Sequence, residues 1–313
     1  MRVLVLGGTG FIGRHVAAAL AARGHQVSIG TRHPARAVRR LPPALRSCEL
    51  REVHFERLAE RSDWHVVIAG CHAVVNAVGI LRPRGAATYD RVHHRAPAAL
   101  AGACALGGRR LVHVSALGLS DAARSRFLLS KLAGERAIAA SGAPYSIVRP
   151  SLLDGEGGFG ARWLRWFARS PVHFIPADAR GRIAVLDVAE LGEAIAALCE
   201  MPANAGSREI EVGGLAAPTM GEYLAVLRTR HSSRPALRVP VPAWLARLAS
   251  HLCDVAHFSP FSYGHLELLR RDNVPRPNLL PRLLGRNPLD LAFVGRRSEL
   301  AEPAPVALRR PAL

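Results

Sequence analysis

The sequence has almost no lysine. Lys131 is the single lysine among 42 lysines and arginines, and the formal net charge is +18. Aromatic residues make up only 5% of the chain, and its arginines are spread along it. A nucleic-acid-binding module more often gathers its positive charge into one patch or stripe. We therefore attribute most of the charge to a compositional bias toward arginine, and we expect no nucleic-acid partner.

The sequence also lacks paired cysteines. Its five cysteines lie far apart, without a Cys-x-x-Cys pair. This spacing argues against a disulfide framework or a zinc site and is typical of a protein in a reducing cytosol. His93 and His94 have no second ligand cluster, so we expect solvated side chains there and predict no metal.

Long apolar runs are missing as well. No run of about eighteen apolar residues occurs, and the best candidate, 183–203, is interrupted by Asp187, Glu190 and Glu193. Asp187 is expected to be a helix N-cap. The first strand reaches Gly7 too soon to contain a signal-peptide core. We expect a cytoplasmic protein that is at most peripherally bound at the inner membrane surface.

In the first half, short β-branched runs alternate with helical patterns rich in alanine and leucine. Strands are expected at 2–6, 26–31, 49–53, 73–78, 110–115 and 145–148, and helices at 11–23, 89–106 and 125–140. The strands are mostly apolar, as is typical when helices cover both faces of a parallel sheet. We predict an α/β fold with a doubly wound parallel Rossmann sheet over residues 1–150.

The second half is less regular. Strands are expected at 183–186 and 209–212, and helices at 187–200, 220–228 and 243–252. We expect 183–212 to contribute core elements to the Rossmann sheet, and 151–275 otherwise to form a smaller C-terminal substrate or partner region. Prolines become dense after Pro275, so 276–313 is expected to be an extended tail.

A glycine-rich loop follows the first expected strand and opens the first expected helix. It contains Gly7, Gly8, Thr9, Gly10, Phe11, Ile12 and Gly13. Gly7 permits a tight turn, Gly10 lets the backbone approach a pyrophosphate, and Gly13 lets the helix pack closely on the strand. The helix N-terminus then faces the phosphates. This context predicts a dinucleotide-binding site; the alternative is a glycine turn that has lost its ligand.

The end of the second expected strand bears on the choice of cofactor. A carboxylate there usually binds the ribose hydroxyls of NAD, but no Asp or Glu occurs between Gly24 and Ser47. Arg32 and Arg36 occur instead, and a guanidinium group pairs well with a phosphate. We predict NADP(H) as the preferred cofactor, with NAD(H) as the alternative.

Four further motifs follow the glycine loop. They are Val-Asn-Ala-Val-Gly at 75–79, Leu-Val-His-Val-Ser-Ala-Leu-Gly at 111–118, Ser-Lys-x-x-Gly-Glu at 130–135 and Tyr-Ser-Ile-Val-Arg-Pro-Ser at 145–151. With them, residues 1–230 resemble an atypical, extended-type member of the short-chain dehydrogenase/reductase superfamily. Segments 75–81, 113–118 and 130–135 are most similar to the group containing the nucleotide-binding accessory subunit of respiratory complex I and its bacterial relatives.

The resemblance implies a catalytic Tyr-x-x-x-Lys pair, in which the tyrosine exchanges a proton with the substrate and the lysine binds the nicotinamide ribose. Lys131 stands at the lysine position, but Phe127 stands at the tyrosine position. Phenylalanine has no proton to give, so the standard acid–base step cannot run from there. The helper serine corresponds either to Ser115 or to the position of Leu117.

Lys131 also stands out on chemical grounds, because arginine serves wherever this chain needs only a surface cation. A lysine offers a compact ammonium group whose pKa burial can lower. We predict that Lys131 binds the ribose or acts alone as the general acid. The alternative is a lysine that persists by chance on an exposed helix face.

Further residues are expected beside the cofactor. Asn76, Ala77, Val78 and Gly79 end the fourth strand near the adenosine half, where small residues permit close backbone approach. Asn76 either stabilises the end of that strand or touches the ligand. Pro150 follows the sixth expected strand and is expected to pack against the nicotinamide.

Residues 161–169 combine cations and aromatic residues at helical spacing. One stripe contains Arg162, Arg165 and Arg169, and the neighbouring apolar stripe contains Trp163, Trp166 and Phe167. Such a helix fits either the wall of a substrate pocket or a peripheral contact with an anionic membrane or a protein.

Two functions remain open. The first is an NADP(H)-dependent oxidoreductase of atypical mechanism, in which Lys131 supplies or positions a proton. Its small-molecule substrate would be apolar, like a quinone or an isoprenoid. The second is a non-catalytic nucleotide-binding subunit or assembly protein that docks on a membrane or a respiratory complex. Phe127 favours the second function, and Lys131 suits either; no oligomeric state follows from the sequence.

Overall fold

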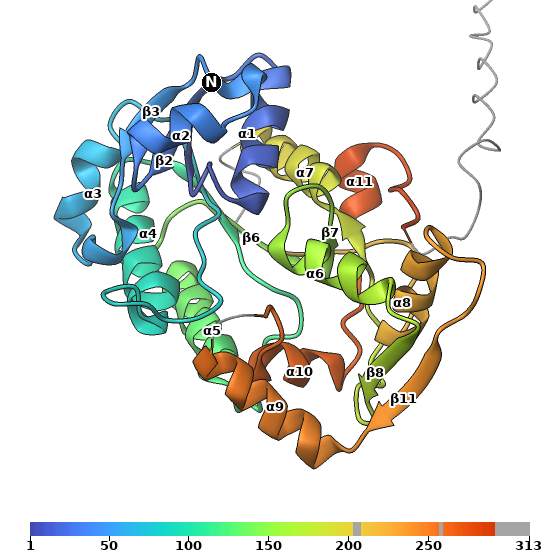
Figure 1. Cartoon of the computed structure of the whole chain (residues 1–313). Coiled ribbons are helices and arrows are strands. Elements are labelled where there is room, and N and C mark those ends of the chain that lie inside the picture. Colours follow the sequence, from blue (N-terminus) through green and yellow to red (C-terminus); the bar gives the residue numbers. More distant parts are fainter. Residues whose placement is uncertain (203–207, 257–258, 292–313) are drawn as a thin grey trace, which may run out of the picture.

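A seven-stranded parallel sheet, in the order β10-β6-β5-β4-β1-β2-β3, lies at the centre of the computed structural model, which describes residues 1–202, 208–256 and 259–291 (Figure 1). The strands are β1 (Arg2–Leu6), β2 (Gln26–Thr31), β3 (Glu49–Glu52), β4 (Ala73–Asn76), β5 (Arg110–Val114), β6 (Tyr145–Pro150) and β10 (Arg208–Val212). The chain runs from β1 outward to β3, then returns to β4 and runs outward in the other direction. This reversal confirms the predicted doubly wound Rossmann sheet.

Helices cover both faces of the sheet. They include α1 (Phe11–Ala22), α2 (Pro34–Arg40), α3 (Arg61–Val67), α4 (Ala96–Leu106), α5 (Arg126–Ala139) and α7 (Val188–Glu200). Val3 and Val5 of β1 pack in a cluster with α1 and α7, whereas Leu4 and Leu6 point the other way, into a cluster with α3 and α4. The uninterrupted apolar sequence of β1 therefore follows from burial on both faces.

The structure differs from the expected helices of the first half in three places. The single helix expected at 89–106 is divided into a π-helical turn, η3 (Asp90–Arg95), and α4, whose first turn contains a proline that cannot donate a backbone hydrogen bond. The helices α2 and α3 were not predicted, because each has only seven residues and too few turns to show a clear apolar period.

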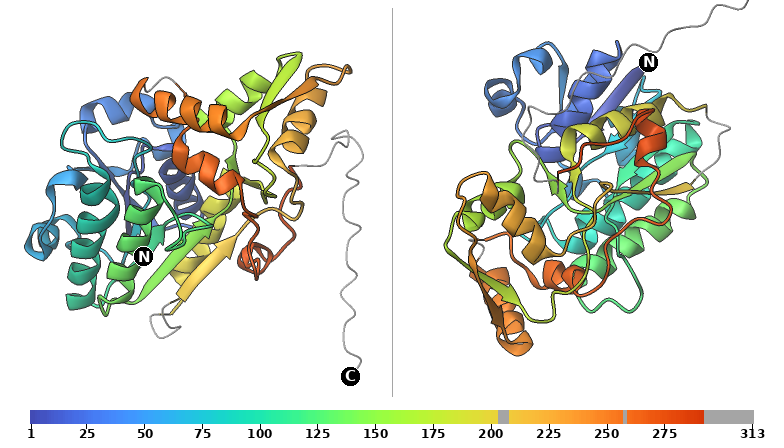
Figure 2. Two further views of the ribbon diagram at one scale, coloured as in Figure 1. Left: turned by 90° about the horizontal axis from the view of Figure 1, so that it is seen from below. Right: turned by 90° about the vertical axis from the view of Figure 1, so that its right-hand side faces the viewer.

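A smaller region follows β6. It contains β7 (Leu153–Asp154), α6 (Phe159–Ala168), β8 (Val172–Pro176), β9 (Leu186–Asp187), α8 (Met220–Thr229), β11 (Leu237–Val241), α9 (Ala243–Ala256) and α10 (Tyr263–Leu269). β7 pairs with β9 and β8 pairs with β11, both in parallel. The strand expected at 183–186 is reduced to β9 and a bridge between Ile183 and Asn273. Figure 2 shows this region on one side of the central sheet.

The proline-rich end of the chain is not simply an extended tail. Helix α11 (Leu280–Leu284) packs on α7, and Leu280 is fully buried in the core. Arg286 then forms ion pairs with Glu190 and Glu193 of α7. Apolar leucines between the prolines account for this docking, which composition alone did not reveal. Residues 292–313 lie outside the described residues.

Candidate cofactor and catalytic site

The glycine-rich loop joins β1 to α1 in a conformation that requires its glycines. Gly7 has a φ of +72°, and its carbonyl oxygen accepts a hydrogen bond from the Gly10 amide at 2.8 Å. A Cβ on Gly13 would lie 2.2 Å from the same oxygen, so a side chain there would clash with the loop. Within the described chain, no side chain caps α1 and no acid lies in its first turn. The first amides of α1 are therefore free to bind a phosphate.

A cavity of about 330 Å³ lies in front of this loop. Its lining includes Gly7, Thr9, Gly10, Thr31, Arg32, Arg36, Glu56, Ala77, Val78 and Gly79. The structure thus brings together the loop, both arginines and the residues after β4. Glu56 was missed by the sequence reasoning, because it lies in a short 3-10 turn without a motif. Gly8 faces the sheet instead, where a Cβ would lie 2.8 Å from Ile29.

Asn76 stabilises the end of β4. Its Oδ1 accepts a hydrogen bond from the Val78 amide at 3.1 Å, and its Nδ2 lies 3.0 Å from Nδ1 of His113. The Asn76 side chain is fully buried. The structure therefore supports the role of Asn76 in stabilising the end of the strand. Ala77, Val78 and Gly79 line the cavity beside it.

A second cavity, of about 400 Å³, contains the predicted catalytic residues. Its lining includes Phe11, Ile12, Ser115, Leu117, Phe127, Lys131 and Pro150. These residues come from the start of α1, the ends of β5 and β6, and α5, so the site lies at the carboxyl edge of the sheet. The remaining lining is almost entirely apolar, so the few polar groups decide its chemistry.

Lys131 lies one turn after Phe127 on α5, a helix that begins at the N-cap Ser125. Its Nζ is 5.9 Å from the centre of the Phe127 ring, and no hydrogen bond to this nitrogen is found within the described chain. Desolvation lowers the pKa of Lys131 to about 8, against a smaller opposing effect of Glu135. Near neutral pH this ammonium group can give up a proton readily.

Ser115 follows β5 directly and is buried. Its Oγ has no hydrogen-bond partner among the described residues. A buried hydroxyl without a partner is costly, and this one lines the same cavity as Lys131. Leu117 lines the cavity too, but only Ser115 carries a hydroxyl, so the geometry favours Ser115 as the position that meets a ligand.

The Phe127 ring is surrounded by aromatic side chains. The rings of His93 and Tyr89 lie 5.5 and 5.9 Å from it, and that of His265 lies 6.0 Å away. The Tyr89 hydroxyl donates to the Leu81 carbonyl at 2.8 Å. Tyr89 therefore does not replace the missing tyrosine.

The expectation that His93 is solvated is wrong. His93 is buried; its Nε2 accepts from the Ile80 amide at 3.1 Å, and its Nδ1 lies 3.0 Å from Ser130 Oγ. Burial, with a contribution from the Lys131 charge, lowers the pKa of His93 to about 2. Gly134 makes the burial possible, because a Cβ there would lie 1.9 Å from the His93 carbonyl oxygen.

His265, from α10, is a polar residue of the cavity that the sequence reasoning missed. Its Nδ1 lies 2.9 Å from the Pro260 carbonyl. A carbonyl can only accept, so Nδ1 carries the proton and Nε2 is left as an acceptor. Burial lowers the pKa of His265, which keeps the ring neutral. No signal in the sequence connects α10 to α5.

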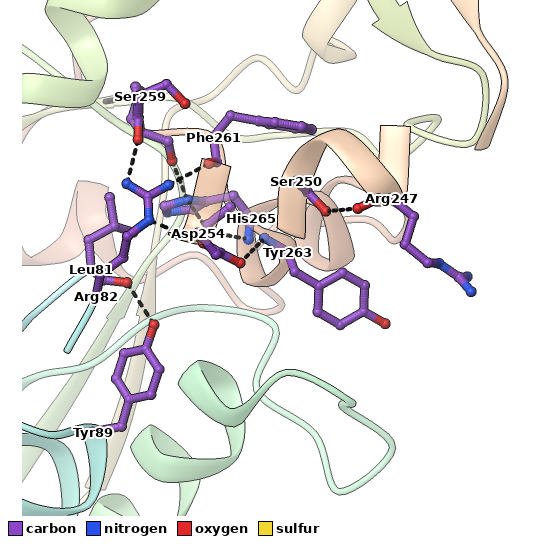
Figure 3. A network of polar contacts seen from close by, with 12 residues as sticks. Leu81, Arg82, Tyr89, Arg247, Ser250, Asp254, Ser259, Phe261, Tyr263 and His265 are labelled. Atoms are coloured by element: carbon purple, nitrogen blue, oxygen red, sulfur yellow. Dashed lines mark hydrogen bonds and ion pairs between the residues drawn. The ribbon is translucent and has the colours of Figure 1, made fainter. Parts of the chain in front are cut away.

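Arg82 fixes the segment that covers this cavity (Figure 3). Its guanidinium group donates to the carbonyls of Ser259 and Phe261, each at 2.6 Å, and pairs with Asp254 of α9 at 3.2 Å. The other carboxylate oxygen of Asp254 accepts from the Tyr263 amide at 3.0 Å. One buried arginine of the Rossmann domain therefore holds Ser259 and Phe261, just before α10, together with Asp254 of α9.

A third cavity, of about 250 Å³, lies next to this one. The two share Trp163, Leu164, Met220, Phe261 and Leu269. The predicted helix at 161–169 is thus a pocket wall on one side. Arg165 departs from the expected basic stripe, because it pairs with the buried Asp154 at 2.7 Å. Arg162, Trp166 and Arg169 remain exposed.

Within the described residues, no group of histidine, cysteine, aspartate or glutamate side chains could hold a metal ion. No helix in the described ranges has both the length and the apolar character needed to span a bilayer.

Residues 7–191 match the profile of the NAD(P)H-binding family. The chain belongs to this family. It is 30% identical over 203 residues to a ceramide reductase from Caulobacter vibrioides, which covers 64% of this chain and 61% of that protein. It is 26% identical over 253 residues to the mitochondrial NADH dehydrogenase [ubiquinone] 1 alpha subcomplex subunit 9 of Dictyostelium discoideum, covering 80% of this chain and 70% of that one.

Solved structures show the same fold. A nucleoside-diphosphate-sugar epimerase from Staphylococcus aureus matches with a TM-score of 0.68 and 18% identity, over 93% of this chain and 98% of the other. The UDP-glucuronic acid 4-epimerase from Bacillus cereus, in complex with UDP-glucuronic acid and NAD, matches with a TM-score of 0.65 and 16% identity. The match covers 93% of this chain and 96% of the other. These findings confirm the resemblance to the atypical, extended short-chain dehydrogenases/reductases. The uncapped start of α1 and its glycines fit the cofactor that the family implies.

Proposed function

We propose that this protein is an NADPH-dependent reductase of a carbonyl group carried by a long-chain, apolar molecule. The observation that carries this proposal is the apolar cavity of about 400 Å³ with Lys131 and the unpartnered Ser115 hydroxyl in its lining, next to a second apolar cavity. A nucleotide sugar would need many polar partners, which this lining lacks. The similarity to a ceramide reductase favours a lipid substrate.

The residues of this chain can complete a carbonyl reduction. When bound, NADPH supplies the hydride that reaches the carbonyl carbon. The Ser115 hydroxyl donates a hydrogen bond to the carbonyl oxygen and holds it in place. The Lys131 ammonium gives its proton to that oxygen as negative charge develops, and solvent returns a proton to Lys131. The product is the alcohol, and Phe127 takes no part in the proton transfer.

The preference for NADPH rests on Arg32 and Arg36. Both line the cavity in front of the glycine-rich loop, and neither forms an ion pair with a described carboxylate. A guanidinium group there can bind the 2′-phosphate of NADP. Titration of NADPH and NADH by fluorescence should give the lower Kd for NADPH, and Arg32→Ser should reduce the difference.

The second candidate is a nucleotide-binding protein without turnover. Phe127 in place of the tyrosine favours it, as does the similarity to the NADH dehydrogenase subunit. Such a protein would bind NADPH and leave it unoxidised.

Oxidation of NADPH in the presence of ketones with increasingly long alkyl chains decides between the two. We expect KM to fall as the chain lengthens, and kcat/KM to fall as the pH rises above about 8, because Lys131 then loses its proton. Lys131→Arg should lower kcat about 100-fold, whereas Arg136→Gln, which removes an exposed cation from the same helix, should leave it unchanged.

Tight NADPH binding without oxidation by any ketone, quinone or enone would support the second candidate. Equal rates for the wild-type protein and Lys131→Arg would rule out Lys131 as the proton donor. Phe127→Tyr should retain cofactor binding under either candidate.

A further inference from the structure

The outer face of α9 exposes a row of large apolar side chains. Trp244, Leu248, Leu252 and Val255 are 68, 50, 60 and 82% exposed. Their spacing of four, four and three residues places them on one side of the helix. The opposite side, with Ala246 and Ser250, is buried. This row is therefore a continuous apolar stripe with no described protein surface covering it.

Two further large apolar side chains are exposed on the strands that precede α9. β11 leads directly into α9, and its first residue, Leu237, is exposed. On the paired strand β8, Phe174 is exposed as well. Figure 1 shows α9, β8 and β11 at the end of the molecule away from α1, α2 and α3. We call this surface the α9 face; it comprises the four apolar residues of α9 with Phe174 and Leu237.

The segment that includes β11 and α9 carries mostly positive charge. Between residues 230 and 256 the exposed cations are Arg230, Arg234, Arg238 and Arg247. The single acid in that stretch is Asp254, which pairs inward with Arg82. An apolar stripe on a segment with exposed arginines complements a surface with an apolar interior and anionic headgroups.

The apolar cavity reaches the same surface. Ala246 and Ala249 on the inner side of α9 line the third cavity, as does the exposed Phe174. That cavity shares five wall residues with the one containing Lys131. The helix that carries the outer stripe therefore also forms part of the wall of the cavity next to the site.

We propose that the α9 face binds peripherally to an anionic lipid bilayer, and that an apolar substrate enters the cavity from that bilayer at Phe174. The entry of substrate rests on the proposed reductase function, whereas binding to the bilayer does not. In this orientation the protein lies on the membrane surface, with α9 in the headgroup region. Its arginines contact the phosphates, and Trp244 and Leu248 enter the acyl boundary.

Flotation with vesicles tests the binding step with the full chain. We expect binding to vesicles of phosphatidylcholine with phosphatidylglycerol, and weak binding to phosphatidylcholine alone. The double variant Leu248→Asp and Leu252→Asp should weaken binding at least about 10-fold. The matched control is Val66→Asp with Leu106→Asp, which places the same charges at exposed apolar positions of the Rossmann domain; it should bind like the wild-type protein.

Three outcomes would overturn the proposal. These are no binding to anionic vesicles, equally tight binding to neutral vesicles, or a wild-type dimer that the Leu248 and Leu252 variant dissociates. NADPH binding and the turnover of a short, water-soluble ketone, measured in solution, should be the same in the variant and the control. If the variant loses only turnover of long-chain ketones held in vesicles, both binding and entry are supported. If turnover is absent in every protein while vesicle binding persists, the reductase function fails and the bilayer contact stands.

Discussion

The Rossmann domain and the region after β6 differ in how far their large apolar side chains are buried. In the first, β1 is buried on both faces, and exposed apolar residues such as Val66 and Leu106 stand alone. In the second, the core is small, and a whole row of large side chains on α9 is exposed. Isolated exposed apolar residues are ordinary, whereas a continuous patch marks a contact. The first region thus holds the cofactor site in a closely packed fold. The second exposes an apolar surface that can contact another molecule.

The largest effect is expected from Gly13→Ala. The new Cβ would lie 2.2 Å from the Gly7 carbonyl oxygen, so the loop or α1 must move. We expect NADPH to bind about 100-fold more weakly and the free energy of unfolding to fall by about 1–3 kcal/mol. The measurements are fluorescence titration and urea unfolding.

Gly160→Ala is the matched change in the second region. There the nearest atom to a new Cβ is on Pro260, at 4.0 Å, so we expect little change in Tm or NADPH affinity. Similar losses in the two variants would contradict the contrast between a tightly built and a more open region.

Arg82→Ala is expected to have the next largest effect, because it tests whether Ser259 and Phe261, just before α10, need this buried arginine. The change leaves Asp254 and two backbone carbonyls without this donor. We expect the KM for a long-chain ketone to rise about 10-fold, and the free energy of unfolding to fall by about 2–4 kcal/mol. The Kd for NADPH should not change.

Arg82→Lys is the control for charge. A lysine keeps the cation but lacks the planar fork that reaches three acceptors, so its effect should lie between those of wild type and alanine. A loss of NADPH affinity as large as the loss for substrate would show that Arg82 acts on both regions.

The smallest effect is expected from Arg286→Ala, at the joint between the chain end and α7. This arginine is 45% exposed and pairs with the exposed Glu193 and the buried Glu190; solvent screens its charge, so we expect a loss of about 1–2 kcal/mol. The Leu289 amide still donates to Glu190. Urea unfolding should therefore show only a small loss, against none for the exposed Arg46→Ala. A loss above about 3 kcal/mol would mean that the buried Glu190 carboxylate depends on this pair.

The parts of the structure that depend on residues close together in the chain could be predicted from the sequence. The bounds of β1 and β2 were predicted to the residue, because their apolar runs and flanking glycines are local signals. The glycine loop, Lys131 and Phe127 were identified from motifs. The partnership of Arg82 with Ser259 was not, because 177 residues separate them and no periodic pattern links one to the other. His93 was misjudged because its burial depends on the close approach of Gly134 from another helix.

The order in which the chain visits its two regions limits how the protein can be divided or recombined. After β6 the chain forms β7, α6 and β8 of the substrate region and returns to the Rossmann domain with α7 and β10. It then forms further elements of the substrate region, and α11 packs on α7. A cut after residue 150 would leave β6 as a bare edge and α1 without its neighbour. The substrate region is therefore a set of excursions from the Rossmann domain and cannot be exchanged as a block. A change in the substrate region therefore has to keep the points at which each excursion leaves and rejoins the Rossmann domain.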